Sequence, residues 1–256
     1  MAVALAFHER GSGPPVLILH GLFGSAGNWA GVARALGERF RVLSLDLRNH
    51  GASPWEQRMD YPALADDVAA FIAAQKLGHA AIIGHSLGGK VAMTLALSAP
   101  RLVERLVVVD IAPVPRAATH LAFVEAMRGL DLASVTRRAA ADALLKPRIP
   151  DDAERAFLLQ NLIFGEDGPH WRINLDAIAA GMDDMAAFPA FSAPYPNPVL
   201  VVRGALSDYV QDRDLPAFRR LFPALRLVTI DGAGHWLHAE KTQQFLDAVT
   251  PFLDGA

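Results

Sequence analysis

A serine, a histidine and one of two aspartates are the residues whose types and spacing could carry nucleophilic chemistry. Ser86 lies in Gly84-His85-Ser86-Leu87-Gly88, which matches the G-x-S-x-G pattern of a nucleophile on a sharp strand-to-helix turn. Side chains two residues before and after such a serine would collide, and glycines there remove the collision. An apolar run precedes the pattern and a helical pattern follows it, which favours a nucleophile over a serine that merely caps a glycine-rich turn. We therefore predict Ser86 as the nucleophile.

The candidate general base is a histidine near the end of the chain. His235 stands in Gly232-Ala233-Gly234-His235-Trp236, between the last predicted strand and the last predicted helix. Imidazole titrates near neutral pH, so a histidine there suits the removal of the serine proton better than a passive place in a surface loop. His235, His238 and Glu240 could also be metal ligands, but they lack the full H-E-x-x-H spacing and no further ligand set stands nearby. The sequence therefore predicts no metal site.

Two aspartates can complete the triad, because its carboxylate follows the serine and precedes the histidine in the chain order of this arrangement. Asp208 lies in Gly204-Ala205-Leu206-Ser207-Asp208, the loop that more usually carries the acid of such a triad. It stands one residue later than in the common G-x-x-D spacing, where this chain has Ser207. Asp110 ends a predicted strand, where catalytic groups gather in open α/β sheets, although an aspartate there also commonly caps the following turn. We favour Asp110 and keep Asp208 as the alternative acid.

Two backbone N–H groups are expected to form an oxyanion hole. Leu87 follows the nucleophile at the start of a predicted helix, where the N–H groups face outward. The loop His20-Gly21-Leu22-Phe23-Gly24 follows another predicted strand. In enzymes with the nucleophile turn described above, a loop at this place in the chain order supplies the second donor. We predict Leu22 as that donor and Phe23 as a residue lining the acyl pocket.

The elements that position these residues alternate between short apolar runs and longer amphipathic segments, which predicts a mostly parallel sheet built from strand–helix–strand units. The predicted strands are 3–8 at an edge, 16–19, 41–45, 80–84, 106–110, 198–203 and 225–230, and the predicted helices between them are 29–36, 61–75, 89–98 and 242–253. The helix over 89–98 ends before Pro100, as expected from the restriction that proline imposes on the preceding residue.

Between Pro113 and Pro198 the alternation stops. This region shows no convincing strand, only helical patterns over 121–128, 132–144, 151–164 and 175–185. We interpret residues 113–196 as a helical cap inserted into one core domain made of 1–112 and 197–256. Extra packing helices without a lid function are the alternative. Apolar cap residues, among them Phe123 and Trp171, could line an acyl pocket or could be the cap's own core.

Composition and charge narrow the class of protein. The 256 residues are 52% hydrophobic and 20% charged, as in a compact globular protein. A formal net charge of −3 with no basic run argues against nucleic acid as a partner. No stretch approaches the roughly 18 apolar residues that span a bilayer, and the short apolar N-terminus lacks the features of a signal peptide. With no cysteine in the chain, a reducing compartment and a cytoplasmic location are the default expectation.

The motifs HGLFGSAGNW, DLRNHGASP, GHSLGGKVAM, VVVDIAPV and GAGHWLHAEKT together resemble the small bacterial YbfF-type esterases and their mitochondrial relatives in the α/β-hydrolase superfamily. The resemblance covers nearly the whole chain and is weakest in the cap. It implies the α/β-hydrolase fold, with an eight-stranded core and a helical cap, no cofactor, and Ser86 and His235 in the triad. Such relatives often lack an aspartate where this chain has Ser207, which supports Asp110. We expect the DLRNHGAS segment to brace the floor of the site.

These observations predict a serine hydrolase that cleaves carboxylic esters or acyl thioesters through an acyl-enzyme on Ser86. The residues expected to contact the substrate are Phe23, Phe123, Trp171 and Trp236. A perhydrolase or haloperoxidase-like activity, or carbon–carbon bond hydrolysis, is the alternative on the same triad. A ligand-binding receptor that keeps the triad with little turnover is the alternative from another class. Dehalogenases and epoxide hydrolases are disfavoured because their nucleophile is an aspartate. The sequence does not indicate whether the protein forms oligomers.

Overall fold

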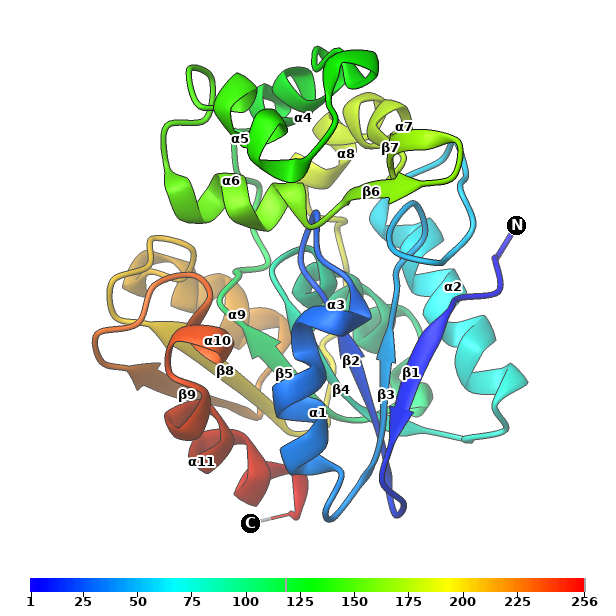
Figure 1. The fold of residues 1–256 in the computed structure, drawn as a ribbon. Helices are drawn as coiled ribbons and strands as arrows, with labels where there is room; N and C mark the ends of the chain where they lie inside the picture. The colour runs from blue at the N-terminus through cyan, green and yellow to red at the C-terminus, as the bar shows by residue number, and fades with distance from the viewer. Residues whose placement is uncertain (118, 256) are drawn as a thin grey trace.

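The computed structural model describes residues 1–117 and 119–255 and contains one large sheet with helices on both faces (Figure 1). Seven strands follow one another in the order β1-β3-β2-β4-β5-β8-β9. Their bounds are β1 Phe7–Arg10, β2 Pro15–Leu19, β3 Arg41–Leu45, β4 Ala80–His85, β5 Val103–Val109, β8 Val199–Gly204 and β9 Leu225–Ile230. β1 runs antiparallel to β3, and the other pairs are parallel. The carboxyl ends of the parallel strands therefore share one edge, where open α/β sheets place their sites.

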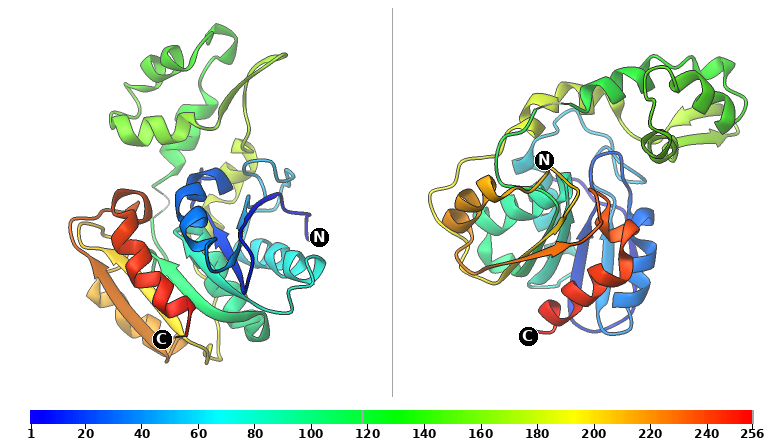
Figure 2. Two further views of the ribbon diagram at one scale, coloured as in Figure 1. Left: turned by 60° about the horizontal axis from the view of Figure 1, so that its bottom comes forward. Right: turned by 90° about the vertical axis from the view of Figure 1, so that its left-hand side faces the viewer.

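The central strands are apolar over their whole length because both faces are covered. α1 (Ala30–Leu36) and α11 (Thr242–Leu253) pack on one face, while α2 (Tyr61–Ala74), α3 (Leu87–Ser98) and α9 (Leu215–Leu221) pack on the other (Figure 2). Shorter helical pieces are η1 Ala26–Trp29, η2 Pro100–Leu102, η4 Asp212–Asp214 and α10 Leu237–Glu240. The α/β-hydrolase fold class that the sequence predicts is thus confirmed.

The resemblance implied eight core strands, whereas the sheet has seven among the described residues, as many as the apolar runs predicted. The difference lies at the N-terminal edge, where residues 1–6 form no strand. Two of their N–H groups bond to side chains: the N–H of Val3 donates to Asp67 at 2.8 Å, and that of Ala6 to the Ser53 hydroxyl at 2.9 Å. The predicted edge strand over 3–8 accordingly begins later, at Phe7.

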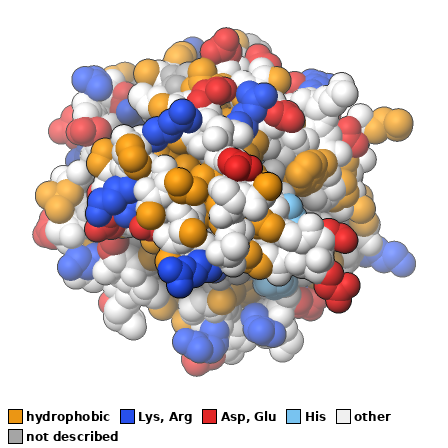
Figure 3. Space-filling model, turned by 45° about the horizontal axis from the view of Figure 1, so that its top comes forward, with side chains coloured by type: hydrophobic (Ala, Val, Ile, Leu, Met, Phe, Trp, Pro, Cys, Tyr) orange, Lys and Arg blue, Asp and Glu red, His pale blue; other side chains and the backbone are white. Residues whose placement is uncertain are grey.

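A second layer lies above the carboxyl edge of the sheet and is built from the chain between β5 and β8 (Figure 1). It contains α4 (Leu121–Arg128), η3 (Leu132–Ser134), α5 (Arg138–Leu145), α6 (Asp152–Leu159), α7 (Leu175–Ala180) and α8 (Met182–Ala186). This layer is the predicted cap, although its domain bounds at 113–196 stay a prediction. Figure 3 looks toward it and shows hydrophobic, basic and acidic side chains interspersed on that face.

The expectation of a cap without strands was wrong, because β6 (Leu162–Gly165) and β7 (Gly168–Trp171) form an antiparallel hairpin. The sequence pattern predicts one helix over 151–164, whereas α6 ends at Leu159. The hairpin closes through Glu166-Asp167, and Gly168 has a φ of 98°, a backbone conformation that favours glycine. The Asp167-Gly168 pair is a hairpin signal that the helical pattern before it concealed.

Direct hydrogen bonds dock the cap on the core. The Asn161 side-chain amide donates to the carbonyl of Phe23 at 2.8 Å, and the N–H of Asn174 donates to the carbonyl of Asn49 at 3.0 Å. The Tyr61 hydroxyl donates to the carbonyl of Met185 at 2.6 Å.

Within the part of the chain that the structure describes, no helix is long and apolar enough to cross a bilayer. A cytoplasmic location stays a prediction.

Candidate active site

Ser86 occupies a strained turn between β4 and α3. Its φ of 51° and ψ of −116° are uncommon for a residue with a side chain. A Cβ at Gly84 would lie 2.3 Å from the carbonyl oxygen of Gly88, and a Cβ at Gly88 would lie 2.4 Å from that of Leu19. The glycines therefore allow the turn in the way the sequence predicted. Its result is a serine that is partly exposed beside residues that are buried.

Asp110 and His235 meet although 125 residues separate them in the chain. The Nδ1 atom of His235 lies 2.7 Å from an oxygen of the Asp110 carboxylate, which is fully buried. That carboxylate also accepts hydrogen bonds from the N–H of Gly204 at 3.1 Å and from the Ser207 hydroxyl. Donors on several sides hold the carboxylate, so it can fix the orientation of the imidazole.

Asp208, the alternative acid, takes a different place. Its carboxylate accepts a hydrogen bond from the side-chain amide of Gln211 at 3.0 Å and makes no contact with His235 among the described residues. The preceding residue, Ser207, is the one that turns toward the acid and donates to Asp110. The geometry favours Asp110 over Asp208, and the catalytic role of either residue stays a prediction.

Two buried histidines hold the loop that is predicted to supply an oxyanion donor. The N–H of Phe23, which has a φ of 63°, donates to Nε2 of His50 at 3.2 Å. The N–H of Leu47 donates to Nε2 of His20 at 3.0 Å, and the N–H of Gly88 donates to the carbonyl of His20 at 3.1 Å. Burial lowers the pKa of His20 to about 4 and that of His50 to about 3, so both rings are neutral acceptors at pH 7.

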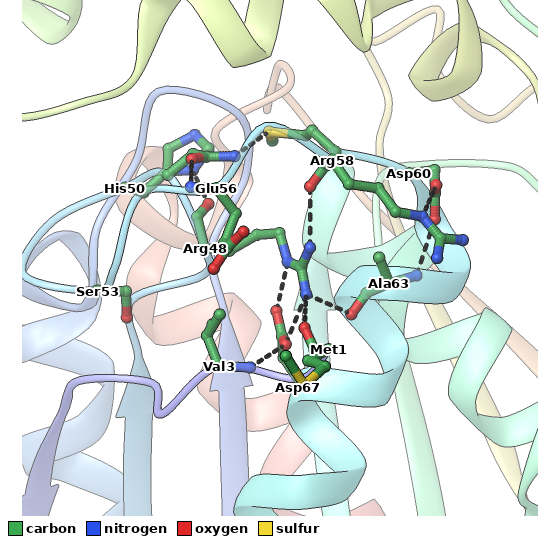
Figure 4. A network of polar contacts seen from close by, with 12 residues as sticks. Met1, Val3, Arg48, His50, Ser53, Glu56, Arg58, Asp60, Ala63 and Asp67 are labelled. Atoms are coloured by element: carbon green, nitrogen blue, oxygen red, sulfur yellow. Dashed lines mark hydrogen bonds and ion pairs between the residues drawn. The ribbon is translucent and has the colours of Figure 1, made fainter.

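The loop from Asp46 to Ser53 is braced from below by a buried ion pair (Figure 4). Nε and Nη2 of Arg48 donate to the two oxygens of Asp67 at 2.6 and 2.7 Å, and both side chains are almost completely buried. Nη1 of Arg48 also donates to the carbonyl of Arg58 at 2.9 Å. Since the same loop carries His50, these contacts fix the ring that holds Phe23, as a bracing role requires.

A cavity of about 340 Å³ lies between the cap and the carboxyl edge of the sheet. Ser86 and His235 line it, together with three of the four residues predicted to contact substrate, Phe23, Phe123 and Trp236. The fourth, Trp171, does not line it, because its ring packs against the apolar core from the end of β7. Leu22 lines the cavity as well. Leu87 lines a neighbouring cavity, and because it is the first residue of α3, its N–H has no partner within the helix.

Tyr209 and His85 contact His235, and Arg116 lies behind Tyr209; the sequence predicted a structural role for His85 and no role for the other two. The Tyr209 ring stacks on the imidazole at 3.8 Å between centroids, and the Arg116 guanidinium lies 5.2 Å from the centre of the Tyr209 ring. Nε2 of His85 lies 2.9 Å from the carbonyl of His235, and burial sets the pKa of His85 well below its usual value. The sequence offered one signal for the contact between Tyr209 and His235, because Tyr209 follows Ser207 by two residues in the loop after β8.

The fold and this arrangement define a class of protein. The family model described as the alpha/beta hydrolase fold matches residues 14–242, and the chain belongs to that family.

Relatives and a solved structure agree over nearly the whole length. The chain is 42% identical over 254 residues to the sn-1-specific diacylglycerol lipase ABHD11 of Xenopus laevis, covering 95% of this chain and 81% of that protein. It is 33% identical over 241 residues to the esterase YbfF of Escherichia coli, covering 94% and 93% of the two chains. The structure of a marine microorganism esterase superposes with a TM-score of 0.95 at 38% identity and covers 98% of this chain and all of that one.

Proposed function

We propose that this protein is a serine carboxylesterase that hydrolyses carboxylic esters, with acyl thioesters as a second class of substrate. The observation that carries the proposal is the 2.7 Å contact between Asp110 and His235, made at the cavity that Ser86 and His235 both line. A buried carboxylate on one imidazole nitrogen leaves the other nitrogen available to a serine hydroxyl.

In the first half of the reaction, the Oγ of Ser86 attacks the ester carbonyl carbon while its proton passes to Nε2 of His235. The Asp110 carboxylate stabilises the imidazolium that forms. The bond from the carbonyl carbon to the alcohol oxygen then breaks, and this oxygen takes the proton from His235. The alcohol leaves, and the acyl group remains on Ser86.

In the second half, water gives a proton to His235 and attacks the acyl carbon. The bond to Ser86 breaks, the serine oxygen regains the proton, and the carboxylic acid leaves. In both halves the negative charge on the carbonyl oxygen needs donors, which we assign to the N–H groups of Leu22 and Leu87. Each such donor contributes a factor of about 100 to 1,000 in kcat.

The names of the relatives support ester substrates. One is a diacylglycerol lipase and another an esterase, and the marine enzyme is an esterase as well. Their shared reaction is the cleavage of a carboxylic ester. The aromatic and aliphatic side chains that line the first cavity suit the apolar part of such a substrate.

The test is hydrolysis of p-nitrophenyl esters from acetate to palmitate by the wild type and by Ser86→Ala. We expect turnover by the wild type and background rates for Ser86→Ala, with one chain length preferred. Equal rates for both proteins on every ester would contradict the proposal. A perhydrolase, a carbon–carbon bond hydrolase or a receptor would then be the better account. A fluorophosphonate that labels the wild type but not Ser86→Ala checks the nucleophile independently of the ester chosen.

A further inference from the structure

A second cavity, of about 270 Å³, meets the first at the nucleophile. Ser86, Leu22, His120 and Tyr209 line both cavities. The second cavity is enclosed by α3 from the core and by α8 from the cap, and its remaining walls are largely apolar. The proposed mechanism places no part of the substrate in this space, although Ser86 and Leu87 line it.

Lys90 presents a buried cation to this cavity. It lies one helical turn after Ser86 on α3, and only 2% of the residue is exposed. Its Nζ donates to the carbonyls of Ala187 at 2.9 Å and Ala186 at 3.5 Å and lies 5.5 Å from the centre of the Tyr61 ring. Among the described residues, no carboxylate pairs with it. A lysine has three N–H donors, and a buried cation without an acid is rare because its burial is costly.

Arg116 adds a second positive charge to the same cavity. Its Nη2 donates to the carbonyls of Asp208 at 2.9 Å and Tyr209 at 2.5 Å and forms an ion pair with the Asp214 carboxylate at 3.4 Å, while its Nε is buried without a partner. Burial, together with the charge of Arg116, lowers the pKa of Lys90 to about 8, so Lys90 is still mostly protonated at pH 7. None of the described residues that line this cavity is an aspartate or a glutamate. The cavity therefore combines apolar walls with positive charge.

The place of His235 decides which half of an ester this cavity can hold. His235 lines the first cavity but not the second. The departing alcohol oxygen must take its proton from His235, so the alcohol part belongs on the side of the first cavity. The acyl part then extends from Ser86 into the second cavity, toward Lys90.

From this geometry we propose that the second cavity binds the acyl part of the substrate and that Lys90, with Arg116, binds a carboxylate at the far end of that acyl part. The preferred substrates are then half-esters or half-thioesters of short dicarboxylic acids. This inference rests on the proposed function, since it names the acyl group that Ser86 would accept. A carboxylate would give the Lys90 ammonium the anionic acceptor that it lacks among the described residues.

A purely structural role for Lys90 is the competing explanation. Its bond to Ala187 lies at the C-terminal end of α8, where a cation stabilises the last carbonyls of a helix. This role would stabilise the cap whichever acyl group is bound, so substrate preference separates the two explanations.

The experiment compares monoethyl glutarate with ethyl pentanoate, which have acyl chains of equal length with and without a terminal carboxylate, and follows acid release. Its readout is the ratio of the two kcat/KM values. We expect the ratio to favour monoethyl glutarate in the wild type and to fall about 10- to 100-fold in Lys90→Met, the scale of one charge-assisted hydrogen bond. Lys146→Met, which removes an exposed cap lysine, is the matched control and should keep the wild-type ratio.

Titration of the wild type and Lys90→Met with free glutarate and pentanoate by calorimetry tests the subsite without turnover. Glutarate should bind the wild type more tightly than pentanoate, and this difference should shrink in Lys90→Met. Hydrolysis of both esters with no preference, or an equal loss for both esters in Lys90→Met, would overturn the subsite and leave the esterase standing. Glutarate binding that depends on Lys90 without hydrolysis of either ester would support the subsite and contradict the proposed function.

Discussion

At the scale of single residues, the position of Asp110 depends on its backbone as much as on its side chain. The residue follows the last residue of β5 with a φ of 51°, a conformation that aspartate tolerates better than most side chains. Its N–H donates to the carbonyl of Val202 on the neighbouring strand at 2.9 Å. This backbone geometry turns the carboxylate toward the loop after β8 and so toward His235.

The first prediction concerns the acid. Asp110→Asn should lower kcat on the preferred ester by about 10,000-fold, because an amide cannot hold the imidazole in the correct tautomer or stabilise its charge. Asp208→Asn is the matched control one loop away, and we expect its kcat to stay close to that of the wild type. Steady-state kinetics on both purified variants provides the measurement. If Asp208→Asn were the crippled variant instead, the acid would lie in the later loop.

At the scale of elements, two short turns position the groups that we propose to be catalytic. The turn at Ser86 requires the backbone of α3 to approach the oxyanion loop so closely that the N–H of Gly88 bonds to the carbonyl of His20 at 3.1 Å. The hairpin of β6 and β7 positions the cap in a similar way, since Asn161 just before it donates to the carbonyl of Phe23. The cap and the turn at Ser86 therefore both fix the same loop.

The second prediction tests the close approach at the turn. Gly88→Ala should lower the free energy of unfolding by about 1–3 kcal/mol or more, because the new Cβ would meet the carbonyl oxygens of Leu19 and His20 at 2.4 and 2.6 Å. Gly31→Ala, in α1 with no neighbour within 4 Å, should instead raise it by roughly 0.5–1 kcal/mol. Urea unfolding of the two variants gives both values, and equal effects would contradict the steric explanation.

At the scale of the whole molecule, buried histidines make the stability depend on pH. Burial lowers the pKa of His20 to about 4 and the pKa values of His50 and His238 to about 3, and it holds the pKa of His85 well below its usual value. In the unfolded chain these rings have a pKa near 6.5. Below pH 6.5 the unfolded chain therefore binds protons that the folded chain refuses, so stability is retained above that pH and lost as the pH falls toward 4 and 3.

The third prediction uses His238 to isolate this effect. His238→Phe should keep the stacking on Trp29, now 4.0 Å between centroids, and remove a buried Nδ1 that has no partner. The slope of unfolding free energy against pH between about 6 and 4.5 should fall by about 1.4 kcal/mol per pH unit, because unfolding then takes up one proton fewer. His8→Gln, which alters an exposed histidine on β1, is the control and should keep the wild-type slope. Urea unfolding at several pH values measures the slopes, and an unchanged slope in His238→Phe would refute the assignment.

Much of the architecture could be predicted from the sequence because it follows from local patterns. The apolar runs predicted the strands of the sheet, since strands buried on both faces read as continuous hydrophobic segments. The spacing of glycines around Ser86 predicted the turn, since only residues without a Cβ fit there. The helix over Thr242–Leu253 was predicted with its observed bounds, because its apolar residues recur at helical spacing.

Tertiary structure alone decided the contacts between residues that are distant in the chain. The choice between Asp110 and Asp208 depends on the direction in which two loops turn, and neither strand pattern contains that direction. The hairpin after α6 escaped prediction because short apolar runs do not distinguish a strand from the end of a helix. The cavity at Lys90, which no aspartate or glutamate lines in the described part of the chain, could not be predicted either, since it is enclosed only where α8 of the cap meets α3 of the core. Local pattern determines the elements, and long-range packing decides which side chains face one another.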